Sequence, residues 1–175
     1  MKKHIVCGSA AIVLTGLTAA MFSLAASQTR ENGSHPEPVR AGSVSTVETV
    51  ARGRYLARTA GCNDCHTPGY AGSSGAVDEQ EWLVGDSVGW QGPWGTTYPA
   101  NLRLLVQNLT PEQWLVVARR PARPPMPWFG LRDMTDADVL AIYHYVRSLG
   151  AAGQPAPAWV PPGQPTATPV VKFPG

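Results

Sequence analysis

The sequence has few cysteines and few charged residues, and each shortage excludes a class of protein. Its 175 residues include only three cysteines, Cys7, Cys62 and Cys65, too few for a small secreted domain held together by disulfides. Charged residues make up 15%, and 14 Lys and Arg stand against 12 Asp and Glu, so no basic footprint typical of a nucleic-acid-binding protein stands out. With 43% hydrophobic residues but also 18 Gly and 17 Pro, the composition indicates a globular chain with long loops.

Residues 1–27 predict an export signal. A basic start at Lys2 and Lys3 precedes residues 5–26, which contain no charged side chain and end in small residues. The alternative is a retained membrane anchor, because about 20 apolar residues are enough to cross a bilayer. Cleavage would remove Cys7 and leave a periplasmic chain that begins with a polar linker over residues 28–44.

Three segments carry signals for the start of a helix. Ser45 and Thr110 each precede, by three residues, a Glu or Gln that can complete a capping box, and Pro111 suits a first helical position. Thr135 is followed by acidic residues, which stabilise the first turn of a helix. These signals predict helices at about 46–60, 111–120 and 136–149.

The patterns of side chains predict how two of these helices meet. The helix at 136–149 has one apolar stripe, formed by Val139, Ile142, Tyr143, Val146 and Leu149. The helix at 46–60 has a stripe of small residues that lets another helix approach closely, formed by Val50, Gly53, Ala57 and Ala60. We therefore expect the first and last helices to pack against each other.

Two segments lack such a pattern. Residues 67–109 are rich in Gly, Trp and Pro and predict a long loop, which a compact domain tolerates when the loop surrounds a large apolar group. Residues 151–175 contain seven prolines in 25 residues and predict an extended tail with few hydrogen bonds. One domain is therefore expected over residues 45–150, followed by this tail.

The pentapeptide Cys62-Asn63-Asp64-Cys65-His66 indicates the chemical function of the chain. Its C-x-x-C-H pattern is that of covalent haem attachment, in which two thiols add to the vinyl groups and the histidine binds the iron. A zinc site is disfavoured because it needs four ligands and the mature chain offers no further cysteine. A redox dithiol of the thioredoxin type is disfavoured because the pair follows a helical pattern and not a strand.

A second axial ligand would come from Met126, Met134, His35 or His144. His35 lies in the linker, and His144 lies opposite the apolar stripe of its helix, where we expect an exposed side chain. Met134 has a packing role at the start of the last helix. Met126 is flanked by three prolines, which restrict the backbone as a weak neutral ligand at a fixed distance requires. The residues therefore favour Met126.

The order of helix, C-x-x-C-H, long loop, helix, Pro-rich Met loop and helix resembles the class I c-type cytochromes over residues 46–150. The segment from Met126 to Tyr143 is similar to that of cytochromes serving periplasmic dehydrogenases. The resemblance implies an all-α, cytochrome c-like fold, with three main helices and long loops around one covalently attached haem c. It implies Cys62 and Cys65 as thioether anchors, His66 as proximal ligand and Met126 as distal ligand. Many members orient the proximal histidine with a proline carbonyl, for which this sequence shows no clear match.

Protein ligands at both axial positions predict one-electron transfer, because substrate then has no access to the iron. We expect an electron carrier, or the electron-transfer subunit of an oxidoreductase, acting in the periplasm between a dehydrogenase and a respiratory acceptor such as an oxidase or another cytochrome. The alternative is a haem enzyme or gas sensor in which Met126 dissociates. A third possibility is a dithiol or zinc-binding interaction module.

Tryptophans and arginines are expected around the haem. Burial among indoles would raise the redox potential, because a low dielectric penalises the extra charge of ferric iron. Each indole would either bind a propionate or simply pack in the core. Arginines would pair with propionates or with an acidic partner, although such arginines more often form a solvated face. The candidates are Trp82, Trp90, Trp94, Trp114, Trp128, Arg103, Arg119, Arg120 and Arg123.

Overall fold

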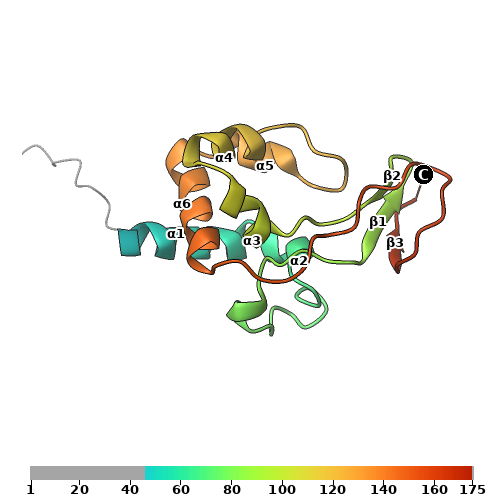
Figure 1. Cartoon of the computed structure of the whole chain (residues 1–175), viewed down its shortest axis with the longest axis horizontal. Helices are drawn as coiled ribbons and strands as arrows, with labels where there is room; N and C mark the ends of the chain where they lie inside the picture. Colours follow the sequence, from blue (N-terminus) through green and yellow to red (C-terminus); the bar gives the residue numbers. More distant parts are fainter. Residues whose placement is uncertain (1–45, 175) are drawn as a thin grey trace, which may run out of the picture. The chain divides into compact units, whose positions relative to one another are not determined.

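The computed structural model describes residues 46–174, so the predicted export signal, the linker and the capping Ser45 lie outside the described residues. This part of the chain is mostly helical (Figure 1). None of its helices combines the length and the apolar character needed to cross a bilayer. Its longer helices are α1 (Thr46–Thr59), α4 (Pro111–Ala118) and α6 (Asp136–Ser148), and its shorter ones are α2 (Cys62–His66), α3 (Leu102–Leu105) and α5 (Trp128–Asp133).

The helices α1, α4 and α6 confirm the three predicted helices, and α4 ends two residues before its predicted end at 120. Thr110 and Gln113 form the complete capping box, since each side chain bonds the other residue's backbone N–H. At the start of α6 the Thr135 hydroxyl accepts a hydrogen bond from the backbone N–H of Asp138. The local signals thus act as predicted.

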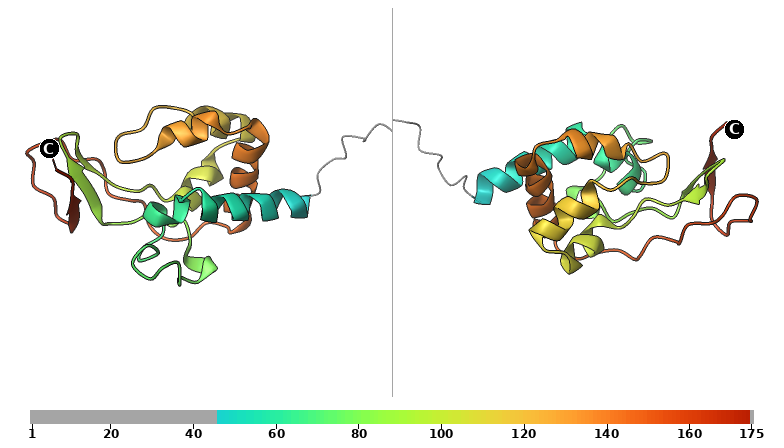
Figure 2. Two further views of the ribbon diagram at one scale, coloured as in Figure 1. Left: turned by 180° about the vertical axis from the view of Figure 1, so that it is seen from behind. Right: turned by 90° about the horizontal axis from the view of Figure 1, so that it is seen from above.

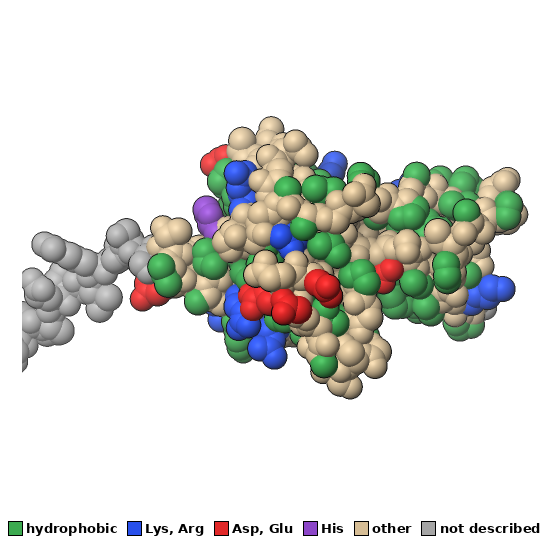
Figure 3. All heavy atoms as spheres, turned by 60° about the horizontal axis from the view of Figure 1, so that its bottom comes forward, with side chains coloured by type: hydrophobic (Ala, Val, Ile, Leu, Met, Phe, Trp, Pro, Cys, Tyr) green, Lys and Arg blue, Asp and Glu red, His purple; other side chains and the backbone are tan. Residues whose placement is uncertain are grey.

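The predicted pairing of the first and last helices is confirmed, with α6 lying across α1 (Figures 1 and 2). A Cβ atom at Gly53 would overlap the carbonyl of Ala141, so only glycine allows this approach. At the edge of the contact Arg52 binds Asp138 at 2.9 Å. On the face drawn in Figure 3, acidic side chains lie beside Lys and Arg.

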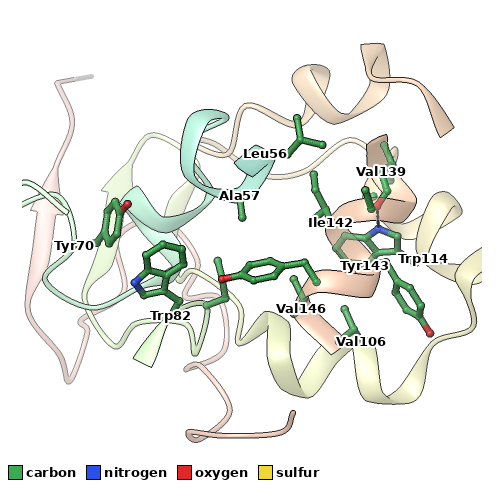
Figure 4. Packing of buried hydrophobic residues seen from close by; sticks show 14 residues of the cluster. Leu56, Ala57, Tyr70, Trp82, Val106, Trp114, Val139, Ile142, Tyr143 and Val146 are labelled. Atoms are coloured by element: carbon green, nitrogen blue, oxygen red, sulfur yellow. Dashed lines mark hydrogen bonds between the residues drawn. The ribbon is translucent and has the colours of Figure 1, made fainter. Parts of the chain in front are cut away.

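A cluster of buried apolar side chains lies around this crossing (Figure 4). The indole N–H of Trp114 donates to the carbonyl of Val139 at 2.9 Å, which joins α4 to α6 inside the core. The hydroxyl of Tyr143 donates to the carbonyl of Leu109 at 2.7 Å. Both aromatic residues therefore bury their rings without leaving a polar atom unpaired.

The prediction of a continuous loop over 67–109 is wrong, because this segment contains short elements. They are the 3-10 helix η1 (Glu79–Glu81), the strands β1 (Gly89–Gly92) and β2 (Gly95–Thr97), helix α3 and the 3-10 helix η2 (Val106–Asn108). The strands form an antiparallel hairpin in which Gly92 pairs with Gly95, whose φ of 92° favours glycine. Asn101 caps α3 by accepting a hydrogen bond from the N–H of Leu104 at 3.0 Å.

The proline-rich tail is extended as predicted, but the expectation of few hydrogen bonds is wrong. Its strand β3 (Val170–Lys172) pairs parallel with β1, and the sheet order is β2-β1-β3. Residues Thr96 and Val160 form a further bridge between the hairpin and the tail. The side-chain amide of Asn101 donates to the carbonyls of Ala152 and Gln154. The tail's non-proline residues therefore supply the bonds that its prolines lack.

Candidate functional site

Helix α2 carries both cysteines and the histidine of the C-x-x-C-H motif. Gly61, with a φ of 76°, lets the chain turn between α1 and α2. Because Cys62 and Cys65 are three residues apart, one helical turn places them on the same side, and His66 follows directly. All three line one cavity, and the two thiols are not joined by a disulfide.

The loop after α2 fixes the helix through buried side chains. The hydroxyl of Thr67 donates to the side-chain oxygen of Asn63 at 2.8 Å and accepts the N–H of Leu83 at 2.8 Å. Both Asn63 and Thr67 are buried. The carbonyl of His66 accepts the N–H of Gly85 at 2.8 Å. These bonds fix the backbone around His66 independently of any bound group.

His66 is presented to the cavity as a neutral ligand. Its Nδ1 lies 2.8 Å from the carbonyl oxygen of Ala100, which can only accept, so Nδ1 carries the proton and Nε2 keeps a free lone pair. Burial lowers the pKa of His66 below its ordinary value, despite the opposing hydrogen bond to Ala100. The imidazole is therefore uncharged at neutral pH, as metal ligation requires.

The two thiols are protonated at neutral pH. Burial raises the pKa of Cys62 to about 11, with the carboxylate of Asp64 adding to the effect. Burial also raises the pKa of Cys65. A redox dithiol requires a thiol with a lowered pKa, and this pair has the opposite environment. Residues 46–174 contain no group of three or more His, Cys, Asp or Glu placed to hold a metal ion.

The cavity has a volume of about 1060 Å³ and a mostly apolar lining. Helix α2 lies on one side, and the loop between α4 and α5 lies across from it (Figures 1 and 2). The volume, the sulfurs and the unpaired imidazole nitrogen together fit a porphyrin with an iron at its centre. Apolar lining residues include Trp90, Pro99, Leu102, Leu105, Trp114, Leu131 and Ile142.

The structure brings the predicted distal residue into the same cavity. Met126 lines it together with Cys62, Cys65 and His66. The backbone N–H of Met126 donates to the carbonyl of Arg123 at 3.3 Å, and the carbonyl of Met126 accepts the N–H of Trp128 at 2.9 Å, where α5 begins. The sulfur donor thus lies in a turn at a helix start.

The other proposed ligands differ in position. Met134 also lines the cavity while packing against the core, so two methionines reach this space. His144 is not among the lining residues. It is half-buried against the ring of Tyr143, so the expectation of an exposed side chain is wrong. His35 lies outside the described residues.

The predicted set of tryptophans is partly wrong. Trp90, Trp114 and Trp128 line the cavity, whereas Trp82 and Trp94 do not. The ring of Trp82 packs edge-on against Tyr70, and the ring of Trp94 packs against Phe173. Four indole N–H groups donate to backbone carbonyls, and they belong to Trp82, Trp94, Trp114 and Trp159.

The four candidate arginines divide into two pairs. Arg103 is buried and donates to the backbone carbonyls of Gln80, Leu149 and Gly150, so it is not a propionate ligand. Arg119 binds Asp136 at 2.5 Å and the carbonyl of Met134 at 3.1 Å. Arg120 and Arg123 do line the cavity.

The sequence interpretation missed two parts of the site. Ala100 supplies the carbonyl for His66, and it directly follows Pro99, so a proline lies beside this acceptor without providing it. Pro157 and Trp159 of the tail line the cavity as well. No local pattern identified either, because each depends on a contact with a segment far away in the sequence.

Comparisons with known proteins agree with this geometry. The family model described as Cytochrome c matches residues 50–150. The fructose dehydrogenase cytochrome subunit of Gluconobacter japonicus is 29% identical over 143 residues, covering 75% of this chain and 26% of that protein. The chain therefore spans about a quarter of the length of this curated relative. No solved structure matches the chain.

Proposed function

Because the chain belongs to the cytochrome c family, whose members transfer electrons by means of a c-type haem, we propose that it carries single electrons on one haem attached through Cys62 and Cys65. In this proposal His66 and Met126 are the axial ligands. Family membership, together with the helices, confirms the predicted all-α, cytochrome c-like fold.

The observation that carries the proposal is the state of His66. The hydrogen bond to Ala100 at 2.8 Å holds the ring with Nε2 free, and His66 lies on the wall of a cavity that also contains both cysteines and Met126. No described residue bonds Nε2, so this nitrogen is left for an iron. A dithiol module would give no reason for such an imidazole beside its thiols.

The proposed ligands also favour a function as an electron carrier over a function as an enzyme. Bound haem supplies a one-electron couple between ferrous and ferric iron. With His66 and Met126 at the two axial positions, the protein leaves no position for a substrate. Methionine ligation and the apolar lining both favour the ferrous state, so the residues present favour a high potential.

The proposed partners follow from the similarity to a cytochrome subunit of a dehydrogenase. We place this chain between a periplasmic dehydrogenase as electron donor and a respiratory oxidase or another cytochrome as acceptor. The export signal predicted at residues 1–27 supports the periplasmic location.

The test begins with production of the full chain in a host that has the cytochrome c maturation machinery. A pyridine haemochrome spectrum is expected to show one haem per chain with two thioether bonds. The ferric protein is expected to show the sulfur-to-iron charge-transfer band, and to bind cyanide slowly. A colourless product would refute the assignment of haem attachment. Fast binding of cyanide or CO by the native protein would instead support the enzyme or gas-sensor alternative.

A further inference from the structure

The C-terminal tail reaches the cavity although it lies beyond the family match. The family model ends at residue 150, yet Pro157 and Trp159 line the same cavity as Met126. Figures 1 and 2 show the tail running back along the hairpin of β1 and β2. The tail is therefore structurally part of the site's wall.

The tail is held at Trp159 by contacts with the hairpin. Backbone hydrogen bonds join Thr96 and Val160 in both directions, at 2.8 and 3.0 Å. The indole N–H of Trp159 donates to the carbonyl of Trp94 at 3.0 Å. A Cβ atom at Gly95 would overlap the carbonyl of Val160, so glycine is needed for the tail to lie this close. The position of the Trp159 ring is thus set by the sheet.

This ring contacts the loop that carries Met126. The guanidinium of Arg123 lies 4.3 Å from the centre of the Trp159 ring, a cation–π arrangement. The carbonyl of Arg123 in turn accepts the backbone N–H of Met126. From the hairpin, the hydroxyl of Thr97 donates to the carbonyl of Pro124 at 2.7 Å.

The loop depends on such outside contacts. Pro124, Pro125 and Pro127 have no backbone N–H, so the loop has few donors for hydrogen bonds of its own besides the bond from Met126 to Arg123. Its residues 121–124 are exposed, and Met126 is half-buried. Contacts from the hairpin and the tail therefore determine where the thioether lies.

We propose that Arg123 and Trp159 are positioning residues, through which the C-terminal tail holds the Met126 loop against the cavity and keeps small external ligands out. The proposal rests on the proposed function, since it assumes Met126 as the distal ligand. Arg123 and Trp159 touch neither iron nor partner in this role; they act through the loop.

The test measures imidazole binding to the ferric holoprotein, using the full chain. Trp159→Ala is expected to increase the rate of imidazole binding about tenfold, which corresponds to an activation free energy lower by about 1.4 kcal/mol. It is also expected to weaken the sulfur-to-iron charge-transfer band. Arg123→Ala, at an exposed position, is expected to give the same change. Arg123→Lys and Trp159→Phe keep a cation and a ring, and each is expected to restore most of the native rate.

Phe173→Ala is the matched control, because it removes an aromatic ring from the tail that packs on Trp90 and Trp94 and does not line the cavity. Equal acceleration in Phe173→Ala, or native rates in both Arg123→Ala and Trp159→Ala, would overturn the proposal.

Met126→Ala distinguishes a failure of the positioning role from a failure of the ligand assignment. If Met126→Ala binds imidazole fast and the Arg123 and Trp159 variants do not, the positioning role fails and the ligand assignment stands. If the native protein lacks the charge-transfer band, the ligand assignment itself fails.

Discussion

The two sides of the cavity hold their donor atoms in different ways. On the side of α2, both cysteines and His66 lie within five consecutive residues, and buried side chains fix the backbone around them. On the opposite side, Met126 lies in an irregular loop held by Thr97 and by Trp159 from distant segments. The donor atoms of the α2 side therefore come from adjacent residues, with Ala100 orienting His66, whereas the position of the donor on the loop side depends on tertiary contacts. Substitutions on each side should differ accordingly.

The largest effect is expected on the α2 side. Cys65→Ala removes one thioether and is expected to abolish most covalent haem incorporation, because α2 then offers only one attachment point. Haem staining of the denatured chain measures this directly. Asp64→Ala, at an exposed position between the cysteines, is the control and is expected to keep the haem. Normal covalent haem in Cys65→Ala would show that α2 is not the attachment site.

The next effect concerns the loop side. Met126→Ala is expected to leave a folded holoprotein whose midpoint potential falls by on the order of 100 mV, a fraction of the roughly 0.8 V that axial ligands span. Met134→Ala is expected to change the potential little and to lower the free energy of unfolding by about 1 kcal/mol or more, through a lost core contact. Redox titration of both variants decides between them. A large shift only in Met134→Ala would reverse the ligand assignment.

A third effect tests the helical frame that carries α2. Gly53→Ala would place a methyl group against the Ala141 carbonyl, and we expect the free energy of unfolding to fall by about 3 kcal/mol. Gly72 lies outside the cavity, and a Cβ atom there would meet only the carbonyl of Gly69 at an ordinary 3.7 Å, so Gly72→Ala is expected to raise the same quantity by about 0.5 kcal/mol. Denaturant unfolding of the holoproteins measures both. Equal effects of the two substitutions would show that α1 and α6 do not approach closely.

The smallest effect depends on pH. The Arg54 guanidinium at 2.6 Å and the Tyr145 hydroxyl at 2.9 Å hold the pKa of Glu79 below its ordinary value. A lowered pKa contributes stability that is present above the pKa of the unfolded chain and is lost as the pH falls through the folded value. Glu79→Gln is expected to lower the free energy of unfolding by about 1 kcal/mol at neutral pH. The effect is small because Arg54 is half-exposed and solvent screens the pair.

The control for this prediction is Glu81→Gln, at an exposed position in the same 3-10 helix. The difference in free energy of unfolding between Glu79→Gln and the native protein should shrink as the pH is lowered. The free energy of unfolding of Glu81→Gln should follow that of the native protein throughout. A constant difference at all pH values would show that Glu79 contributes through packing and not through its charge.

Much of the helical frame was predictable because its signals are local. The capping box at Thr110 and the small-residue stripe around Gly53 act within one turn or one helix face, and both appear in the structure as predicted. The strands were not predicted, because β1 and β2 are short and β3 comes from a tail whose prolines suggested no pairing. Trp82 and Trp94 were assigned to the cavity on residue type alone, which does not determine where an indole points.

The sequence by itself determined that two thiols and an imidazole lie close together, because Cys62, Cys65 and His66 stand within five adjacent residues. Only the tertiary structure decided which carbonyl orients His66 and which segments hold the Met126 loop. Ala100, Thr97 and Trp159 do so across long stretches of chain, where packing of the whole domain brings donor and acceptor together. No local sequence pattern identifies such residues, because their function depends on what the fold places beside them.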